Sequence, residues 1–326
     1  MKQAVVRPKK YYYTVSFSGL AESISARGGE DAFVSGITYA VTQAVRRAGA
    51  RFEEVFLRGD GTGRITNVKG TATNTAVVSV NDTIPFRPNQ VIVFLSNTTG
   101  ALVDGPVTVV SRDNSASTIT VNTPVTAAIG DGIYYQSEQN GSGPIQEITA
   151  LGLPALVNNT GQIYGLSRVV YPGLQSKVID AVSTALDESM LRRLRTRILI
   201  DSAAESLDGY AMVSHLSQFD RYTEIALPFR RFFDNRLELG ADVQMTTFEG
   251  RGWMVSWAAL RDELYLMNLA AIERGVVRPF GIDERVNMTW LPGQDAFMIA
   301  MKAYFEYVGR SLNETGAIRN LTYPSW

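Results

Sequence analysis

The stretch of sequence that decides the fold is DAFVSGITYAVTQAVRRAGARFEEVFLRGDGTG, residues 31–63. Apolar side chains recur in it every three or four residues, the spacing of one face of an α-helix. They are Phe33, Ile37, Val41, Val45, Ala48, Phe52 and Phe56. Asp31 is suited to the first turn, and the three glycines among residues 59–63 predict the helix end, because glycine adopts left-handed conformations at low cost. The pattern predicts a helix of about 25 residues, roughly 37 Å long.

A helix this long needs a surface to lie across, and it suits a spine better than a compact bundle, since a helix is stabilised mainly by packing of its apolar face. We expect the apolar stripe to be buried and Arg46 or Arg47 to lie nearer to solvent or to another chain. The expected buried set is Phe33, Ile37, Val41, Val45 and Phe52.

Upstream of this helix, residues 11–17 are aromatic and β-branched and predict a strand, and residues 22–26 predict a second short one. The first ten residues are basic and are followed by no long apolar stretch, so we predict no signal peptide. No apolar run in the chain approaches the about 20 residues that a membrane-spanning helix needs.

Downstream, the composition changes: residues 65–150 hold thirteen threonines but only nine charged residues. Runs of β-branched residues alternate there with turn signals and predict strands over 76–80, 91–95, 107–110, 118–121 and 132–135. Five short strands at near-regular spacing predict a small β-barrel or β-sandwich. The Gly-Ser-Gly-Pro sequence at 141–144 is typical of a linker that leaves it.

The remainder of the chain has mixed character. Residues 151–275 predict helices over 184–198 and 217–222 and strands over 210–213, 243–248 and 253–257. Leu186, Met190, Leu194 and Ile198 share one face of the first of these helices. Residues 276–326 return to strand, with runs over 286–290 and 297–307.

Composition excludes several classes of function. The chain of 326 residues carries 31 basic and 32 acidic side chains, a balance that argues against a free nucleic-acid binder and leaves only local basic patches. It has no cysteine and one histidine, His215, which excludes disulfides, thiol nucleophiles, cysteine-ligated metals and zinc sites that need two histidines. We predict no catalytic residue, no cofactor and no metal site.

The glycine-rich turn at 59–63 is superficially similar to a phosphate-binding loop. It follows a helix, however, whereas phosphate loops precede one, and no Gly-Lys-Ser/Thr sequence comes after it. We interpret it as a helix stop. The integrin tripeptide Arg58-Gly59-Asp60 we attribute to chance.

His215 has Ser214 and Ser217 beside it and Asp220 five residues on. A Ser–His–Asp site needs proximity in space, and the chain has no Gly-X-Ser-X-Gly sequence, so we interpret His215 as a surface or core residue. Two carboxylate groupings, neither spaced like an EF-hand, are interpreted as solvated helix faces. They are Asp201, Glu205 and Asp208, and Asp262 with Glu263.

One basic run stands out and consists of Arg192, Arg193, Arg195 and Arg197. On a helix these side chains spread over an arc of about 200°, which favours a solvated face first and a polyanion contact second. Arginine outnumbers lysine 25 to 6 in the chain, and because arginine forms bidentate pairs well, this favours an extensive protein interface.

Several short motifs occur in a defined order along the chain. They are KYYY at 10–13, FSGLA at 17–21, DAF at 31–33, RGDGTG at 58–63, RRF at 230–232, LG at 239–240, TFEG at 247–250, WMV at 253–255 and AIRNL at 317–321. In this order they resemble the major capsid proteins of tailed bacteriophages of the Hong Kong 97 type. The resemblance covers most of the chain outside residues 65–150.

The resemblance implies an α+β, Hong Kong 97-like capsid fold with a long spine helix, a mixed axial domain and an inserted small β-barrel or β-sandwich. The expected parts are an N-terminal segment with a partial extended loop (1–30), the spine helix of the peripheral domain (31–63), the β-rich insert (64–150), the axial domain (151–275) and the returning strands of the peripheral domain (276–326).

The resemblance also implies a function without catalysis: a coat subunit that self-assembles into an icosahedral shell enclosing the phage genome. The implied partners are further copies in pentamers and hexamers, portal, scaffolding or decoration proteins, and packaged DNA through non-specific contacts, with no membrane. The implied location is the virion, after assembly in the host cytoplasm.

One departure from the family concerns the short segment before the strand at 11–17, which matches only the returning strand of the family's extended loop. A lone strand is marginal in water, so either another segment or subunit pairs with it, or Met1 lies downstream of the true start, or a preceding segment was removed. We favour a strand from a neighbouring subunit or a missing strand, and expect Tyr11, Tyr13 and Val15 to be ordered only in an assembly. Two other classes of function stay open on the residues alone: a hydrolase that uses Asp and Glu, and a β-rich carbohydrate-binding or adhesion protein.

Overall fold

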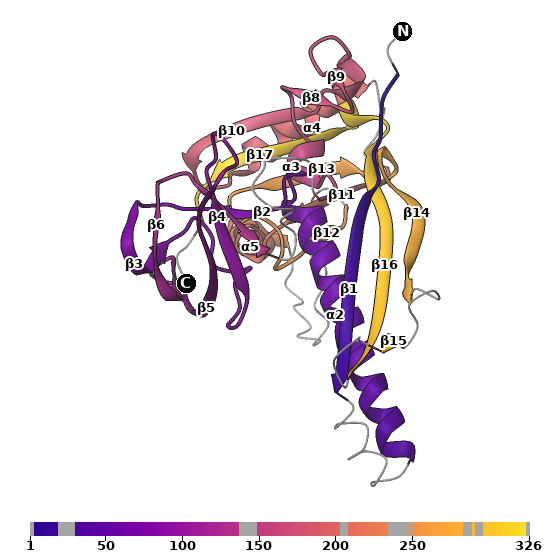
Figure 1. Ribbon diagram of the computed structural model, residues 1–326. Helices are drawn as coiled ribbons and strands as arrows, with labels where there is room; N and C mark the ends of the chain where they lie inside the picture. The colour runs from indigo at the N-terminus through magenta and orange to yellow at the C-terminus, as the bar shows by residue number, and fades with distance from the viewer. Residues whose placement is uncertain are drawn as a thin grey trace.

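The computed structural model describes residues 3–18, 30–136, 149–202, 208–233, 248, 251–282, 289–290 and 296–323. The architecture is α+β, with a long helix, a sheet that runs alongside it, a second sheet flanked by two helices, and a separate group of β-strands (Figure 1). No helix in the described ranges is long and apolar enough to cross a membrane. The strand predicted over 22–26 lies outside these ranges.

The long helix and the long sheet form an elongated unit. Helix α2 (Glu30–Arg58) lies beside an antiparallel sheet in which β16 is central. The strands of this sheet are β1 (Lys9–Ser18), β14 (Ile272–Ile282), β15 (Thr289–Trp290) and β16 (Ala296–Gly309). Phe52 of α2 makes edge-to-face contacts with Tyr11, Phe280 and Phe305 and thereby joins the helix to three strands.

The apolar stripe of α2 is buried only over its C-terminal half. Ala48 and Val55 are fully buried, whereas Val45 is 44% exposed and Tyr39 67% exposed. Val41 is half-buried, and the side chains of Phe33 and Ile37 lie outside the described residues. The predicted burial of Val45 is therefore wrong, because the described residues cover the apolar stripe fully only from Ala48 onward. Arg46 and Arg47 are exposed, as predicted.

The expectation that the first strand lacks a partner within the chain is also wrong. β1 pairs with β16 in one unbroken antiparallel register, from Lys9 opposite Phe305 to Ser18 opposite Ala296. Tyr11 is 6% exposed and lies in the main hydrophobic core, so its order needs no second subunit. The apolar run 297–307 was predicted as a strand, but nothing in the sequence says which strand lies beside it.

A second, mixed sheet follows the order β10-β17-β13-β11-β12. Its strands are β10 (Lys177–Thr184), β11 (Tyr210–Ser214), β12 (Trp253–Val255), β13 (Leu264–Asn268) and β17 (Thr315–Leu321). Two helices flank it, α4 (Glu188–Ser202) and α5 (Leu216–Phe233). Because β17 belongs to this sheet and β14 to the long one, the segment 276–326 does not form one unit as expected, and neither does 151–275.

Two predicted helices have different bounds in the structure. The first begins at Glu188 rather than 184, since the residues up to Thr184 pair with β17 as strand β10. Leu186, Leu194 and Ile198 are nevertheless buried, and Met190 packs against them, as the spacing predicts. The second helix, α5, is longer than predicted. The strand predicted over 243–248 lies almost wholly outside the described residues.

The segment predicted as a β-rich insert holds a separate group of six strands, in the order β2-β7-β4-β5-β6-β3. They are β2 (Arg64–Asn67), β3 (Ala72–Ser79), β4 (Val91–Leu95), β5 (Leu102–Asp113), β6 (Thr118–Ala127) and β7 (Gly132–Tyr135). A bridge between Val68 and Val80 joins the two ends of this order, so the strands enclose their own core. β2 was not predicted.

The remaining elements connect these parts. They are α3 (Leu153–Leu156), the hairpin of β8 (Gln162–Ile163) and β9 (Leu166–Ser167), and short 3-10 turns at Pro172–Leu174, Leu269–Ala271 and Leu312–Glu314. Ala150 and Leu153 are fully buried in the same core as Tyr11 and Phe305. After the insert, the chain is thus part of the main body again by residue 150.

Candidate functional site at the junction of helix, insert and sheet

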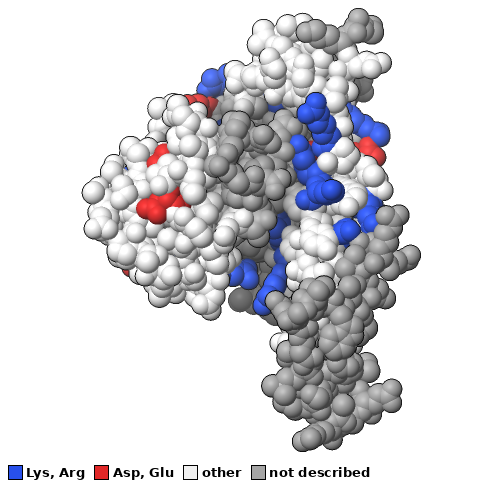
Figure 2. Space-filling view, in the orientation of Figure 1, with Lys and Arg blue, Asp and Glu red and all other residues white. Residues whose placement is uncertain are grey.

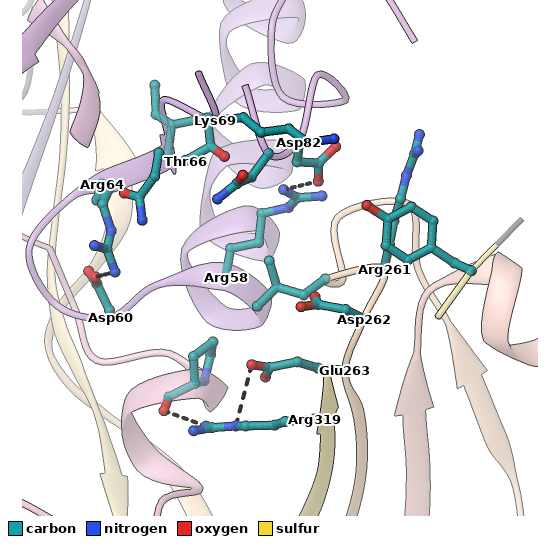
Figure 3. Close-up of a pocket in the computed structure, with 16 residues that line it drawn as sticks. Arg58, Asp60, Arg64, Thr66, Lys69, Asp82, Arg261, Asp262, Glu263 and Arg319 are labelled. Carbon is teal, nitrogen blue, oxygen red and sulfur yellow. Dashed lines mark hydrogen bonds and ion pairs between the residues drawn. The ribbon is translucent and has the colours of Figure 1, made fainter. Parts of the chain in front are cut away.

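A charged cavity of about 610 Å³ lies where α2, the insert and the second sheet meet (Figure 3). Its charged lining comes from four parts of the chain: the end of α2 and the turn after it, the insert, the turn before β13, and β17. These side chains are Arg58, Asp60, Arg64, Lys69, Asp82, Arg261, Asp262, Glu263 and Arg319. Five cations and four carboxylates therefore surround one space.

Arg58, the last residue of α2, is the centre of this junction. Its Nη1 lies 2.6 Å from Oδ2 of Asp82 in the insert, and the two side chains are only 3% and 11% exposed. Its Nε donates a hydrogen bond to the carbonyl of Ala258, at 2.6 Å, and Nη2 donates to that of Ala259, at 3.3 Å. One guanidinium thus connects the helix, the insert and the turn between β12 and β13. Since Arg58 is buried, the Arg-Gly-Asp tripeptide has no exposed arginine.

The glycine turn after Arg58 is a helix stop, as predicted. Gly61 and Gly63 have φ values of +90° and +85°, which side chains rarely adopt. Asp60 accepts hydrogen bonds from the backbone N–H and the hydroxyl of Thr62, at 2.9 and 2.5 Å, and its other oxygen pairs with Arg64 at 2.8 Å. The carboxylate fixes the turn and sends the chain into β2.

Gly152 allows the segment after the insert to approach the end of α2 closely. A Cβ atom built on it would lie 2.3 Å from the carbonyl oxygen of Val55 and 2.7 Å from that of Gly59. Its N–H donates to the carbonyl of Gly59 at 2.9 Å. The chain therefore leaves the main body after Gly59 and returns to it beside the same residue.

Asp262 and Glu263 lie in the turn before β13, not on a helix, so their interpretation as a solvated helix face is wrong. Burial raises the pKa of both carboxyl groups. Glu263 lies 3.3 Å from Nε of Arg319 and accepts a hydrogen bond from the hydroxyl of Tyr265. Arg319 also donates to the carbonyls of Pro154 and Val157, at 2.9 Å each, and thereby ties β17 to α3.

His215 is a buried capping residue. It immediately precedes α5, and its Nδ1 accepts a hydrogen bond from the backbone N–H of Ser217 at 3.1 Å. Burial, with the nearby positive charges of Arg261 and Arg58, lowers its pKa to about 4. The neighbouring Ser214 hydroxyl accepts from the indole N–H of Trp253 at 2.8 Å, so it is oriented by the core. His215 is a core residue, one of the two alternatives that the sequence left open.

The other residues singled out by the sequence lie apart from this junction. Arg192, Arg193 and Arg197 are exposed on α4, where Arg192 pairs with Glu188 at 2.7 Å; Arg195 is half-buried. Asp201 pairs with Lys177, and Asp208 pairs with Arg251 at 2.7 Å, so these two carboxylates do not form a cluster. Glu205 lies outside the described residues. Among the residues that are described, no three acidic or histidine side chains gather to hold a metal ion.

Sequence reasoning missed Arg58, Asp82 and Arg319, and also a buried arginine at the edge of the main core. Arg168 is 1% exposed and donates four hydrogen bonds, of 2.6 to 3.0 Å, to the carbonyls of Ala155, Leu156, Asn158 and Leu174. Burial lowers its pKa to about 10. These residues are far apart in sequence and belong to no periodic pattern, so no local signal reveals them.

Chemically, the junction is a network of ion pairs across segments. Arginine pairs a carboxylate at three places, Arg58–Asp82, Arg64–Asp60 and Arg319–Glu263 (Figure 3). Buried pairs of this kind contribute little net stability, but breaking one is costly. The arrangement therefore holds the insert in a defined orientation relative to α2 and the second sheet.

No protein-family model and no curated protein sequence matches the chain. Solved structures do match. A chain of the cyanophage A-1(L) capsid asymmetric unit matches with a TM-score of 0.56 and 10% identity, over 96% of this chain and 77% of that chain. The satellite phage P4 procapsid matches with a TM-score of 0.42 and 10% identity, over 98% and 72%. The holo-SrpI encapsulin complex from Synechococcus elongatus matches with a TM-score of 0.36 and 11% identity, over 54% and 59%.

Of these three, only the match to the cyanophage capsid is high enough to establish a shared fold. It extends over 96% of the chain. The chain has the α+β, Hong Kong 97-like capsid fold that its order of motifs predicts.

Proposed function

We propose that the chain is a major capsid subunit of a tailed bacteriophage and that it self-assembles into an icosahedral shell enclosing the phage genome. The observation that supports this most is the fold shared with a cyanophage capsid chain over 96% of the present chain. The role is structural and not enzymatic. It places the protein in the virion, after assembly in the host cytoplasm.

The distribution of exposed surface supports the proposal. The N-terminal end of α2 projects beyond the long sheet (Figure 1), and Tyr39 and Val45 in the N-terminal part of the helix are exposed. A helix that projects in this way is short of the packing that stabilises a helix in water, and a neighbouring subunit supplies such packing. Shell formation thus accounts for a feature that an isolated globular protein has no use for.

We assign the parts of the chain to the roles that the family implies, with boundaries adjusted to the sheets. The peripheral domain comprises α2 with β1, β14, β15 and β16. The axial domain comprises the second sheet with α4 and α5, and includes β17. The insert begins at Arg64 and ends with β7.

The proposed partners follow from the proposed function. Copies of the chain form pentamers and hexamers, and the shell as a whole meets portal, scaffolding or decoration proteins and the packaged DNA. Shell contacts of this kind depend on buried area and on charge complementarity. The large share of arginine among the basic residues suits such interfaces.

Negative-stain imaging and light scattering of the purified full chain test the proposal. We expect capsomers or closed shells, in a concentration-dependent equilibrium with smaller species. A small oligomer of fixed size at every concentration would contradict a shell subunit. The alternative of an Asp/Glu hydrolase is tested on the same sample, since an Asp262→Asn variant that lost a measured hydrolytic turnover would show catalysis.

A further inference from the structure

We propose that the open face of the long sheet binds the phosphate backbone of duplex DNA, and that this face points into the shell. The inference rests on the proposed function and goes beyond it, because it assigns the DNA-facing surface to particular side chains. It starts from the two faces of the sheet. Tyr11, Tyr13 and Phe305 face α2, so their neighbours along β1 and β16 point to the opposite side.

On that opposite side, cations and tyrosines alternate in two adjacent cross-strand rows. In the first row, Tyr304 of β16 lies opposite Lys10 of β1 and Arg278 of β14. In the second row, Lys302 lies opposite Tyr12. The Lys10 ammonium lies 5.8 Å from the centre of the Tyr304 ring, and that of Lys302 lies 5.3 Å from the Tyr12 ring.

This arrangement presents groups that contact phosphate. Lysine, arginine and the tyrosine hydroxyl are all used for backbone contacts to DNA, and none of them reads the base sequence there. The cations keep their charge while they lie over the rings, since a cation–π contact transfers no proton. Tyr12 is 51% exposed and Lys10 is exposed, so the face is accessible in the single chain.

Acidic side chains on the same face are few among the described residues. Glu306 is 2% exposed and accepts a hydrogen bond from the backbone N–H of Leu151, at 2.7 Å. Glu273 lies toward the far end of the sheet, opposite Val308, and pairs with Arg310. Figure 2 shows the result: blue side chains gather over the long sheet, with little red among them. The face is therefore complementary to a polyanion.

The chain offers a matched control on α4. Arg193 and Arg197 are exposed there and carry the same total charge as Lys10 and Lys302. They also belong to the basic run for which the sequence left a polyanion contact open. The test compares the full chain, the Lys10→Gln/Lys302→Gln variant and the Arg193→Gln/Arg197→Gln variant, each before assembly, for binding of a short labelled DNA duplex over a series of salt concentrations.

The logarithm of the affinity falls linearly with the logarithm of the salt concentration. Removing two cations that contact phosphates makes this negative slope less steep by about two. We expect this decrease for the Lys10/Lys302 variant and an unchanged slope for the Arg193/Arg197 variant. An equal slope in all three proteins, or a decrease only in the α4 variant, would overturn the proposal. Loss of shells in the Lys10/Lys302 variant with unchanged duplex binding would overturn it too, because the face would then be a contact between subunits.

The direction in which the face points has its own readout. Shells assembled with linear duplex and then treated with nuclease should retain protected DNA, and the Lys10/Lys302 variant should retain several-fold less than the α4 variant. Imaging of the same samples separates the two proposals: normal particles with equal DNA retention would overturn only the DNA-facing surface. Absence of particles at every concentration would contradict the proposed shell-forming function. The DNA-binding face would then still be tested by duplex binding to the unassembled chain.

Discussion

Two regions of the molecule differ in how they bury apolar surface: the insert, and the unit formed by α2 and the long sheet. The six strands of the insert enclose one core, and a bridge between Val68 and Val80 joins the ends of their order. The long sheet has only one of its faces covered by α2, and the N-terminal end of α2 projects beyond it (Figure 1). The insert is complete by itself, whereas the spine unit leaves surface for other molecules. One region of the chain, the insert, thus buries its apolar surface by itself, and another, the unit of α2 with the long sheet, leaves surface available for assembly.

The strongest test of this comparison removes the insert. Excision of residues 65–136 with a short Gly-Ser linker should leave a folded remainder, because the core of the insert is separate from the main one. Excision of 65–150 should abolish folding, since Ala150 is fully buried in the main core and its N–H donates to the Tyr11 hydroxyl at 2.8 Å. Circular dichroism and urea unfolding compare the two. Equal stability of both deletions would show that residues 149–150 are not part of the main core.

A second test compares the two halves of α2. Val55 is 2% exposed, so Val55→Asp places an unpaired charge in the core and should lower the free energy of unfolding by several kcal/mol. Val41 is half-buried on the projecting half, so Val41→Asp should cost about 1 kcal/mol or less in the monomer. Urea unfolding measures both. A large loss from Val41→Asp would mean that the projecting half is packed in the single chain.

The junction that holds the insert in place provides the third test. Arg58→Met removes one partner of a buried pair and leaves the Asp82 carboxylate without its cation, which should lower the free energy of unfolding by about 3 kcal/mol. The control is Arg64→Met, which breaks the more exposed pair with Asp60 and should cost under about 1 kcal/mol. Equal decreases in the free energy of unfolding for the two variants would show that Arg58 is no more important to the junction than Arg64.

The elements with strong periodicity could be predicted from the sequence, and their partners could not. The length and end of α2 follow from its apolar spacing and from the glycines at 59–63, and most strands of the insert follow from their turn signals. The pairing of β1 with β16 joins residues almost 300 positions apart in sequence, and no local pattern encodes it. The expected burial of Val45 failed for a related reason, because periodicity shows which face is apolar but not how far the neighbouring sheet extends.

The site shows the same division. The glycine turn could be interpreted as a helix stop from its position after a helix. His215 could be interpreted only as a surface or core residue, because the chain has no Gly-X-Ser-X-Gly sequence. Arg58 was missed, and Asp262 was wrongly interpreted as solvated, because burial of a charged side chain depends on its neighbours in space. Arginine at the end of a helix usually donates hydrogen bonds to the last carbonyls of the helix or to water. Here the insert closes over it, so a surface-type position becomes an interior one.

The last expected effect, which appears only as the pH falls, is a dependence of stability on pH that arises at His215. Its Nδ1 caps α5 as an acceptor, so the folded protein resists protonation, and burial lowers the pKa from 6.5 to about 4. Below about pH 6.5 the unfolded chain binds the proton first. The contribution of neutral His215 to stability is therefore complete above pH 6.5 and is lost as the pH falls to about 4. The loss is on the order of 3 kcal/mol at most.

His215→Asn is the variant that isolates this effect, because asparagine also caps a helix N-terminus but does not titrate. Asp262 and Glu263 have raised pKa values and give the opposite trend, since a folded state with raised carboxyl pKa values gains relative stability as the pH falls. That trend is common to wild type and variant and cancels in their difference. Urea unfolding at pH 7 and at pH 4.5 should therefore show the wild type losing more stability than His215→Asn. Parallel losses in the two proteins would mean that His215 titrates normally and that its imidazole does not hold the start of α5.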